Sequence, residues 1–314
     1  MSRRRWIASL LFLALLFAIA VRRVDWRAAL AVLERTALAP LAAAAIVNLA
    51  SLVLHGARWS LFLRRVGVRS FTLAVRGAVV AAGLNNLLVA NGGDAARVLL
   101  VARASRVPRT AVLATLALDR IFDPICFALL LLAGTFVVPL PPKLHGTRAV
   151  VALALLAAGA LLVILAQAPE RAASADIRGW RQHLQEFLRR AVGISTGPGL
   201  ALALALSLAM WATQLATFAL VARSVRLEIP VAGSLAALIL TNAGLALRAT
   251  PGNVGFFQFA YAVAVRPFGI DSGSAVAAAL LLQLVQIIPV TIAALVLAPH
   301  MLRERASPSA PDLS

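Results

Sequence analysis

Hydrophobic residues run in long, nearly unbroken stretches along this chain, and polar residues gather at the ends of these stretches. A helix needs about 20 apolar residues to cross the hydrocarbon core of a membrane. Such runs predict transmembrane helices, because a helix on the surface of a soluble domain alternates apolar and polar faces. We therefore expect an all-α, polytopic integral membrane protein with about six full spans. The predicted spans are 6–21, 41–63, 111–138, 149–167, 200–222 and 274–299.

Two further apolar segments, 76–105 and 231–265, are interrupted in their middle by small and polar residues. The interruptions are Asn91-Gly92-Gly93-Asp94 and Arg248-Ala249-Thr250-Pro251-Gly252-Asn253. Glycine permits tight or left-handed turns. Interrupted segments in corresponding places of two halves point to broken helices near the bilayer midplane. We expect two re-entrant hairpins.

Treating the broken segments as hairpins makes the topology alternate regularly. Two half-repeats result, at about 41–138 and 200–299, each with a span, a hairpin and a span. Their orientations are opposite, which is an inverted-topology repeat as found in transporters. The layout predicts a single membrane domain over 1–306 and a short disordered tail, rich in Pro and Ser, over 307–314.

Three other segments have a more limited interpretation. The segment 6–21 follows three arginines and is either an uncleaved anchor or a cleaved signal peptide. The pair Arg22-Arg23 favours the anchor, because basic residues directly after a cleavage site disfavour export. In 174–192, apolar and basic residues fall on opposite helical faces, which predicts an interfacial helix on the inner leaflet. The segment 24–37 has a similar stripe, and a solvated loop helix is the alternative for both.

Composition supports a membrane protein over a soluble one. Hydrophobic residues make up 61% of the 314 residues and charged residues 13%, about half the share in soluble domains. The net charge of +18 does not indicate a nucleic-acid partner, because basic residues at helix ends face anionic lipid headgroups. Most arginines lie on the side that carries both termini, so we expect both termini in the cytoplasm and the protein in a bacterial cytoplasmic (inner) membrane.

The two interruptions resemble anion-binding helix ends. Asp94 is well placed as an N-cap, and Thr250-Pro251 has the form of an N-cap followed by proline at the first helical position. Each tip would then present backbone N–H groups and a positive helix end, which attract phosphate or carboxylate. The alternative is that a hairpin needs a glycine-rich tip in any case.

Asp119, Arg120 and Asp123 lie near the middle of the predicted span 111–138. A charge at that depth is costly, so these side chains should face the bundle interior and have partners. Arg120 can pair with Asp123, three residues away, and Asp119 and Asp123 share a helical face. Two interpretations stay open: a functional site for proton coupling, or a structural ion pair. Further candidate cations are Arg58, Arg97 and Arg248.

Some polar residues have two possible roles. Arg248 either holds a lipid phosphate or pairs internally with an acidic residue, and Arg97 either snorkels to the inner surface or faces the cavity. His55 has no second histidine at ligand spacing, so we expect a hydrogen-bonded packing residue and no metal site.

The chain has no P-loop, Rossmann fingerprint, zinc-protease helix or nucleophile elbow. We therefore predict no catalytic residue, no cofactor and no enzyme activity.

Three motifs resemble the flippase-like family, which is the transmembrane region of lysylphosphatidylglycerol synthases and its stand-alone relatives. They are Gly83-Leu84-Asn85-Asn86-Leu87-Leu88 leading to Gly93-Asp94-Ala95-Ala96-Arg97, then Leu118-Asp119-Arg120-Ile121-Phe122-Asp123, then Thr250-Pro251-Gly252-Asn253-Val254-Gly255-Phe256-Phe257. The resemblance extends from about Leu41 to about Pro299. It departs from the family pattern at Val89, Asn91 and Gln258, where Pro, a basic residue and Glu are expected.

The resemblance implies movement of lipids or lipid-linked sugars between leaflets. The soluble synthase domain is not part of this sequence, so we expect no lysyl transfer. The predicted function is a translocator that holds an anionic phospholipid or polyprenyl-linked headgroup between the hairpins, with Asp119 and Asp123 in proton coupling or ion pairing. The alternatives are a membrane enzyme with Asp119 or Asp123 as general base, and a non-catalytic partner of a lipid-modifying enzyme. The predicted headgroup-binding residues are Gly93, Asp94, Arg97, Arg120, Arg248, Gly252 and Asn253.

Overall fold

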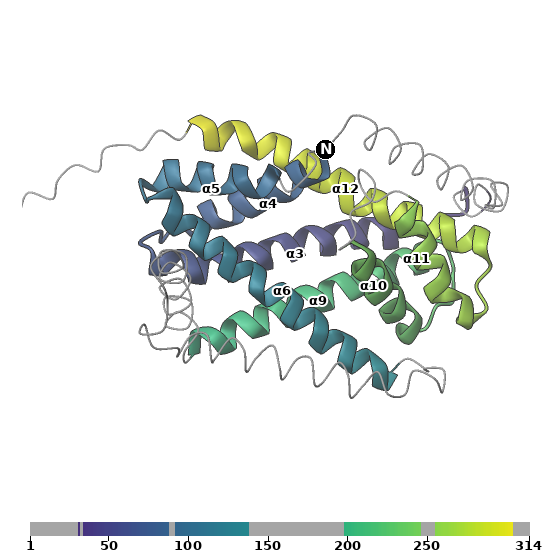
Figure 1. Cartoon of the computed structure of the whole chain (residues 1–314). Coiled ribbons are helices and arrows are strands. Elements are labelled where there is room, and N and C mark those ends of the chain that lie inside the picture. The colour runs from purple at the N-terminus through teal and green to yellow at the C-terminus, as the bar shows by residue number, and fades with distance from the viewer. Residues whose placement is uncertain (1–30, 32–33, 88–91, 138–197, 246–254, 304–314) are drawn as a thin grey trace, which may run out of the picture. The chain divides into compact units, whose positions relative to one another are not determined.

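The computed structural model describes residues 31, 34–87, 92–137, 198–245 and 255–303, drawn as coloured ribbon in Figure 1. These residues are helical throughout, apart from short links, and contain no strand. The predicted all-α class is confirmed for this part of the chain. The helices are α3 (Leu38–Arg65), α4 (Phe71–Leu87), α5 (Gly92–Ser105), α6 (Arg109–Val137), α9 (Pro198–Ser224), α10 (Val231–Leu245), α11 (Phe256–Val265), the 3₁₀ turn η3 (Arg266–Phe268) and α12 (Ser272–Arg303).

Three helices of the described ranges are long and apolar enough to cross a membrane. They comprise Leu38–Arg65, Ala201–Ser224 and Ser272–Pro299, and each coincides with a predicted span. Helix α6 coincides with a fourth predicted span and has 29 residues, but its middle carries three charged side chains. The predicted segments 6–21, 149–167, 174–192 and 307–314, and all of 24–37 except 31 and 34–37, lie outside the described residues. The total of six spans and the re-entrant form of the hairpins therefore stay predictions.

The described helices follow the same order twice along the chain. In each series a long helix comes first, then two short helices, and then a second long helix. The first series is α3, α4, α5 and α6, and the second is α9, α10, α11 and α12. Residues 88–91 and 246–254, where the sequence predicts the interruptions, lie outside the described residues. The half-repeats at about 41–138 and 200–299 stay a prediction.

The first long helix of each series ends in the same hydrogen-bond pattern. After α3, the Val68 N–H donates to the Leu63 carbonyl at 3.0 Å, and Gly67 has φ of 93°. After α9, the Leu227 N–H donates to the Ala222 carbonyl at 3.0 Å, and Arg226 has φ of 56°. This is the Schellman motif, which satisfies helix carbonyls that lack a partner and requires a left-handed residue. Glycine adopts that conformation readily, whereas arginine adopts it with strain.

The chain groups into two compact units, which are described separately. Unit 1 draws its described residues from 1–51, 86–90 and 212–292. Unit 2 draws them from 52–85, 91–211 and 293–314. The first unit therefore contains α10 and α11, and the second contains α5, α6 and most of α4.

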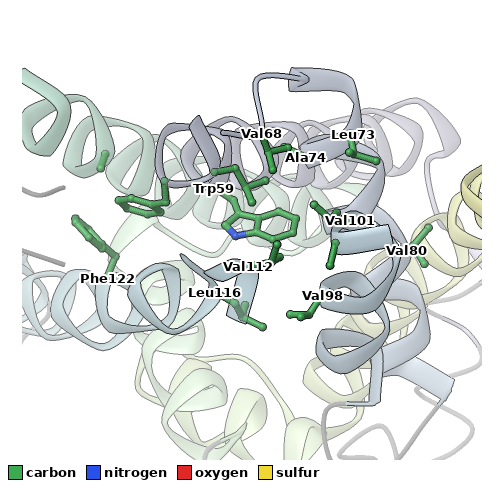
Figure 2. Packing of buried hydrophobic residues seen from close by; sticks show 14 residues of the cluster. Trp59, Val68, Leu73, Ala74, Val80, Val98, Val101, Val112, Leu116 and Phe122 are labelled. Carbon is green, nitrogen blue, oxygen red and sulfur yellow. The ribbon is translucent and has the colours of Figure 1, made fainter. Parts of the chain in front are cut away.

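The core of unit 2 is built around Trp59 on α3, as Figure 2 shows. Its indole ring is fully buried, and its Nε1 donates to Thr115 Oγ1 on α6 at 3.1 Å. A Cβ atom on Gly77 of α4 would lie 3.0 Å from the Trp59 ring and 3.2 Å from Val101 of α5. Small residues at such contacts allow helices to approach closely. The core thus joins α3, α4, α5 and α6 around one aromatic side chain.

In unit 1, α10 and α11 pack against each other as a helical pair. Phe218 of α9 contacts the rings of Phe257 and Tyr261 on α11, with centroids 6.4 Å and 6.2 Å apart. Polar contacts also join the helices of this unit: Gln214 donates to Ser51 Oγ at 3.3 Å and accepts from Gln286 at 3.2 Å. Interhelical hydrogen bonds of this kind are common between membrane helices.

Candidate functional site

Asp119 on α6 is the centre of a network of charged side chains inside unit 2. Its carboxylate is completely buried. It accepts hydrogen bonds from Arg58 Nε at 2.8 Å and from Arg97 Nη2 at 3.2 Å, and His55 Nε2 lies 2.9 Å from it. These partners come from α3 and α5, so packing of three helices is required to assemble them. A buried charge is tolerated only when it is paired and hydrogen-bonded, and Asp119 meets that condition.

Arg58 on α3 connects four groups at once and is itself fully buried. Besides the Asp119 carboxylate, it donates to the Asp119 carbonyl at 3.2 Å and to Asp123 Oδ1 at 2.7 Å. Its Nη1 donates to Ser207 Oγ on α9 at 2.9 Å, and its guanidinium carbon lies 5.9 Å from the centre of the Phe122 ring. Asp119 and Asp123 are four residues apart, so a cation between them removes their mutual repulsion. Arg58 supplies that cation and has a partner at every nitrogen.

Arg97 on α5 is nearly as deeply buried but is less completely satisfied. Its guanidinium lies over the Trp59 ring, 4.4 Å from the centroid, and pairs with Asp119 at 3.2 Å. Its Nε and Asp94 Oδ1 are both buried without a hydrogen-bond partner, and they lie 3.6 Å apart. This distance is an ion-pair contact but is too long for a hydrogen bond. The connection between Arg97 and Asp94 is therefore loosely made.

Arg120 on α6 forms the accessible end of the network. It donates to Asp94 Oδ2 at 2.5 Å and to Asp123 Oδ2 at 3.4 Å. The Arg120 side chain is 42% exposed, against 29% for Asp123, 13% for Asp94 and 0% for Asp119. Three arginines thus face three aspartates in this network, and exposure rises from Asp119 towards Arg120.

Pro124 lies in the same turn of α6 as Asp123. Proline has no N–H, so the carbonyl of Arg120 lacks its helical hydrogen-bond donor. Proline inside a helix also bends it. The exposed end of the network therefore lies at a break in the regular hydrogen bonding of α6.

The structure brings six of the nine predicted site residues into unit 2. Five of them belong to the charge network, and Gly93 lies one residue before Asp94. The prediction that Arg120 pairs with Asp123 is confirmed. The other three predicted site residues, Arg248, Gly252 and Asn253, lie outside the described residues.

The structure decides two of the expectations drawn from the sequence. Of the two alternatives for Arg97, snorkelling to the inner surface is excluded, because its guanidinium is buried between Trp59 and Asp119. The prediction that Asp94 is an N-cap is wrong, because α5 begins at Gly92 and Asp94 lies in its first turn. The N-cap of α11 is Gly255, and the predicted N-cap at Thr250-Pro251 lies outside the described residues.

Gly93 has a packing role that the sequence did not reveal. Its N–H donates to Asn85 Oδ1 on α4 at 2.9 Å. A Cβ atom at this position would overlap the Ala81 carbonyl oxygen and lie 2.8 Å from Asn85 Oδ1. Only glycine lets the start of α5 approach α4 this closely. Its predicted role in headgroup binding stays a prediction.

His55 and Ser207 are the network residues that sequence reasoning did not place. His55 was predicted only as a hydrogen-bonded packing residue, and its contact with Asp119 bears out the hydrogen bond. Ser207 lies in a long apolar run of α9, 149 residues from Arg58. A polar residue in the middle of a predicted span is the sequence signal that could have identified Ser207 as a residue that hydrogen-bonds to another helix. No group of three potential metal ligands is found in the part of the chain that the structure describes.

Gln258, where the family pattern has Glu, is a satisfied amide in unit 1. Its Oε1 accepts from the Gly255 N–H at 2.7 Å, and its Nε2 donates to Gln283 Oε1 on α12 at 2.6 Å. The amide therefore both accepts and donates, which a carboxylate does not do. Through this amide hydrogen bond, Gln258 links α11 to α12.

Helices able to cross a membrane and a charge network inside a helical unit define an integral membrane protein with a polar site. The chain belongs to the family described as the lysylphosphatidylglycerol synthase TM region, whose model matches residues 6–294. The resemblance inferred from the sequence is thereby confirmed. The chain is also 32% identical over 123 residues to the glycosyltransferase AglD of Haloferax volcanii. That match covers 39% of this chain and 20% of the length of AglD. No solved structure matches the chain.

Proposed function

We propose that this protein moves a lipid with an anionic headgroup, an anionic phospholipid or a polyprenyl-linked glycan, between membrane leaflets. Membership of the family supports a role in lipid or glycolipid handling. The similarity to a protein named as a glycosyltransferase supports the lipid-linked glycan as one substrate class. The observation that carries the proposal is the gradient of burial along the charge network, which ends at Arg120.

Arg120 is the proposed phosphate-binding residue. Its guanidinium is the most exposed of the three in the network, and its ion-pair partners there are two partly exposed carboxylates. A phosphate can accept two parallel hydrogen bonds from a guanidinium, as a carboxylate does. A lipid phosphate therefore competes with Asp94 and Asp123 for the same donors. The headgroup then replaces internal ion pairs, so that no charge is left unpaired inside the unit.

The loose contact between Asp94 and Arg97 gives the displaced carboxylate a new partner. When phosphate takes Arg120, Asp94 has a buried cation 3.6 Å away whose Nε has no hydrogen bond. A small rotation of the Asp94 side chain makes that bond. We assign two states to Asp94: bound to Arg120 without lipid, and bound to Arg97 with lipid. A ligand shifts an equilibrium between two states only if it binds the two states with different affinities. Here the lipid phosphate binds only the state in which Asp94 has left Arg120.

The rest of the network has a different task in this proposal. Arg58 and Asp119 are fully buried and hold α3 against α6, so we assign them to the scaffold. Asp123 belongs to both parts, because it pairs with buried Arg58 and with exposed Arg120. We assign Asp123, which is 29% exposed, as the group that exchanges a proton if transport is coupled to protons. The chain carries no nucleotide-binding motif, so transport is downhill or ion-coupled.

The test is a leaflet-accessibility assay in liposomes. The purified protein is reconstituted with a fluorescent phosphatidylglycerol, and an impermeant quencher reports the fraction of dye in the outer leaflet. We expect the protein to increase exchange between leaflets and Arg120→Ala to remove most of that increase. Arg64→Ala is the matched control, because Arg64 is an exposed arginine of α3 outside the network. Equal exchange by Arg120→Ala and the unmodified protein would contradict the proposed site.

A second candidate is a membrane subunit that acts with, or as, a lipid-modifying enzyme. The similarity to AglD favours this alternative over other enzyme classes. Mass spectrometry of the same liposomes distinguishes the two: an enzyme changes the mass of the headgroup when a sugar donor is supplied, and a translocator does not. A change in headgroup mass that depends on Asp119 or Asp123 would favour the enzyme.

A further inference from the structure

A groove of about 980 Å³ lies on the surface of unit 2, away from the charge network. It is lined by α4, α5, the link between α5 and α6, and Ala298 of α12. The residues that α5 contributes include Ala96, Leu99, Leu100 and Arg103, which are spaced at i, i+3, i+4 and i+7 and share one helical face. The groove therefore occupies a different face of α5 from buried Arg97.

The groove is basic at one end and apolar along the rest of its length. The basic end is where α5 stops and α6 starts, and it carries Arg103, Arg106 and Arg109. The apolar part follows α4 and α5 back to Ala96, about 10 Å from Arg103 along the helix axis. The lining contains no acidic side chain. These features match a molecule with an anionic head and an apolar chain, oriented along α5.

We propose that this groove binds one anionic phospholipid from the surrounding bilayer, separately from any transported lipid. The phosphate binds to Arg103 and Arg109, and one acyl chain lies along α4 and α5 over Val80, Leu84 and Leu99. Leu99 is 47% exposed, so an acyl chain buries apolar surface there. A basic pocket between helices at the membrane surface is the expected form of a site for an acidic lipid. The volume lies at the upper end of the range for small-molecule pockets, so the groove holds the headgroup and part of one acyl chain, and the rest of the lipid stays in the bilayer. This site does not depend on the proposed transport function.

The charge of the lining decides between lipid classes. Phosphatidylcholine would bring a quaternary ammonium group beside three guanidinium groups, which is repulsive. The headgroup of phosphatidylglycerol has no cationic group. We therefore expect preference for phosphatidylglycerol over phosphatidylcholine with the same acyl chains.

The experiment is native mass spectrometry of the purified full chain in detergent, titrated with each of these two lipids. The double variant Arg103→Gln/Arg109→Gln should bind phosphatidylglycerol about 25-fold more weakly, since each arginine near a lipid headgroup contributes about a factor of five. The control Arg64→Gln/Arg69→Gln removes two exposed arginines of the same unit that do not line the groove. It should leave the affinity within about twofold. Ala96→Phe fills the apolar part and should weaken binding while all arginines remain.

Two results would overturn the proposal. One is equal affinity for phosphatidylglycerol and phosphatidylcholine in the unmodified protein. The other is an equal loss of affinity in the groove variant and in the control variant. Thermal unfolding of each variant in the same detergent identifies any that are misfolded, and Ala96→Phe then tests the site independently of the charges. Because leaflet exchange is measured separately, failure of this groove leaves the role proposed for Arg120 unaffected.

Discussion

Arg58 and Asp119 lie 61 residues apart on different helices, and they meet at 2.8 Å with no exposure of either side chain. Arg58 also holds Asp123 and Ser207, so one guanidinium joins α3, α6 and α9. Replacing one member of a buried ion pair leaves the other charge without a partner. This relationship separates the part of the network that stabilises the fold from the part that can change partners.

Arg58→Ala should therefore destabilise the protein far more than Arg120→Ala. We expect a loss of about 3–5 kcal/mol in the free energy of unfolding for Arg58→Ala, the range for breaking a buried pair. For Arg120→Ala, whose side chain is 42% exposed, we expect at most about 1 kcal/mol. Unfolding in mixed micelles with increasing dodecyl sulfate, followed by circular dichroism, measures both. Equal destabilisation by the two substitutions would show that the network does not divide as described.

Gly93→Ala should destabilise the start of α5 through a backbone clash. The added methyl group would overlap the Ala81 carbonyl oxygen, which cannot move without shifting α4. We expect a loss of about 1–3 kcal/mol, as for other overpacked sites. Ala95→Val is the control, because Ala95 is exposed on the same turn of α5. The same unfolding assay applies, and a Gly93→Ala protein as stable as the control would contradict the close approach of α4 and α5.

Asp271 should stabilise α12 by capping its first turn, with a defined pH dependence. Its Oδ1 accepts from the Ser274 N–H at 2.9 Å, and these hydrogen bonds hold the pKa of the carboxyl group below its usual value. The stabilisation is therefore complete above the pKa of the unfolded chain, about 3.9, and is lost as pH falls through the lower folded pKa. Asp271→Ala should lose about 1 kcal/mol at pH 7.

The pH dependence is measured as the difference in unfolding midpoint between Asp271→Ala and the unmodified protein, from pH 7 down to pH 3. We expect that difference to shrink only below about pH 4. Asp271→Ser keeps a capping oxygen without the charge, so it should retain most of the stability at every pH. A difference that is constant from pH 7 to pH 3 would show that the carboxylate charge does not contribute.

Arg226→Gly should stabilise the protein, which is unusual for a single substitution. Arg226 occupies the left-handed position of the Schellman motif after α9, with φ of 56°. Glycine removes the strain of about 1 kcal/mol that a side chain has in this conformation. Gly67→Ala, at the equivalent position after α3, should destabilise by a similar amount. Thermal unfolding of both variants should show shifts of opposite sign, and shifts of the same sign would exclude this explanation.

The sequence was sufficient for the class of fold and for the positions of the long apolar helices in the described part of the chain. Runs of apolar residues in spans such as 41–63 and 274–299 specify membrane helices, because their length must match the hydrocarbon core. The glycines at 92 and 93 and the charged residues of α6 also stand out in the sequence, because such residues are unusual inside an apolar segment. These properties belong to single segments, so no knowledge of neighbouring helices is needed.

Partner choice could not be derived from the sequence. Arg58, Arg97 and Arg248 were equal candidates to neutralise the acids of α6, and the structure places the first two on Asp119. Ser207 was not considered, because an isolated serine in an apolar run has no distinguishing spacing. For Gln258 and Gln283 the sequence left open a wet cavity or a hydrogen bond across helices, and the structure pairs them with each other, 25 residues apart. Each pairing depends on side chains that come together only after helices have packed.

The sequence by itself determined an all-helical membrane protein, two apolar segments interrupted by polar residues and the acidic residues in the middle of α6, because hydropathy and charge act along the chain. Only the tertiary structure decided that Arg58 and Asp119 form a closed, buried pair while Arg120 remains accessible. The reason is that burial and hydrogen bonding depend on how α3, α5, α6 and α9 surround each charge. The guanidinium of Arg58 is therefore part of the scaffold, whereas the chemically identical guanidinium of Arg120 is available to a ligand.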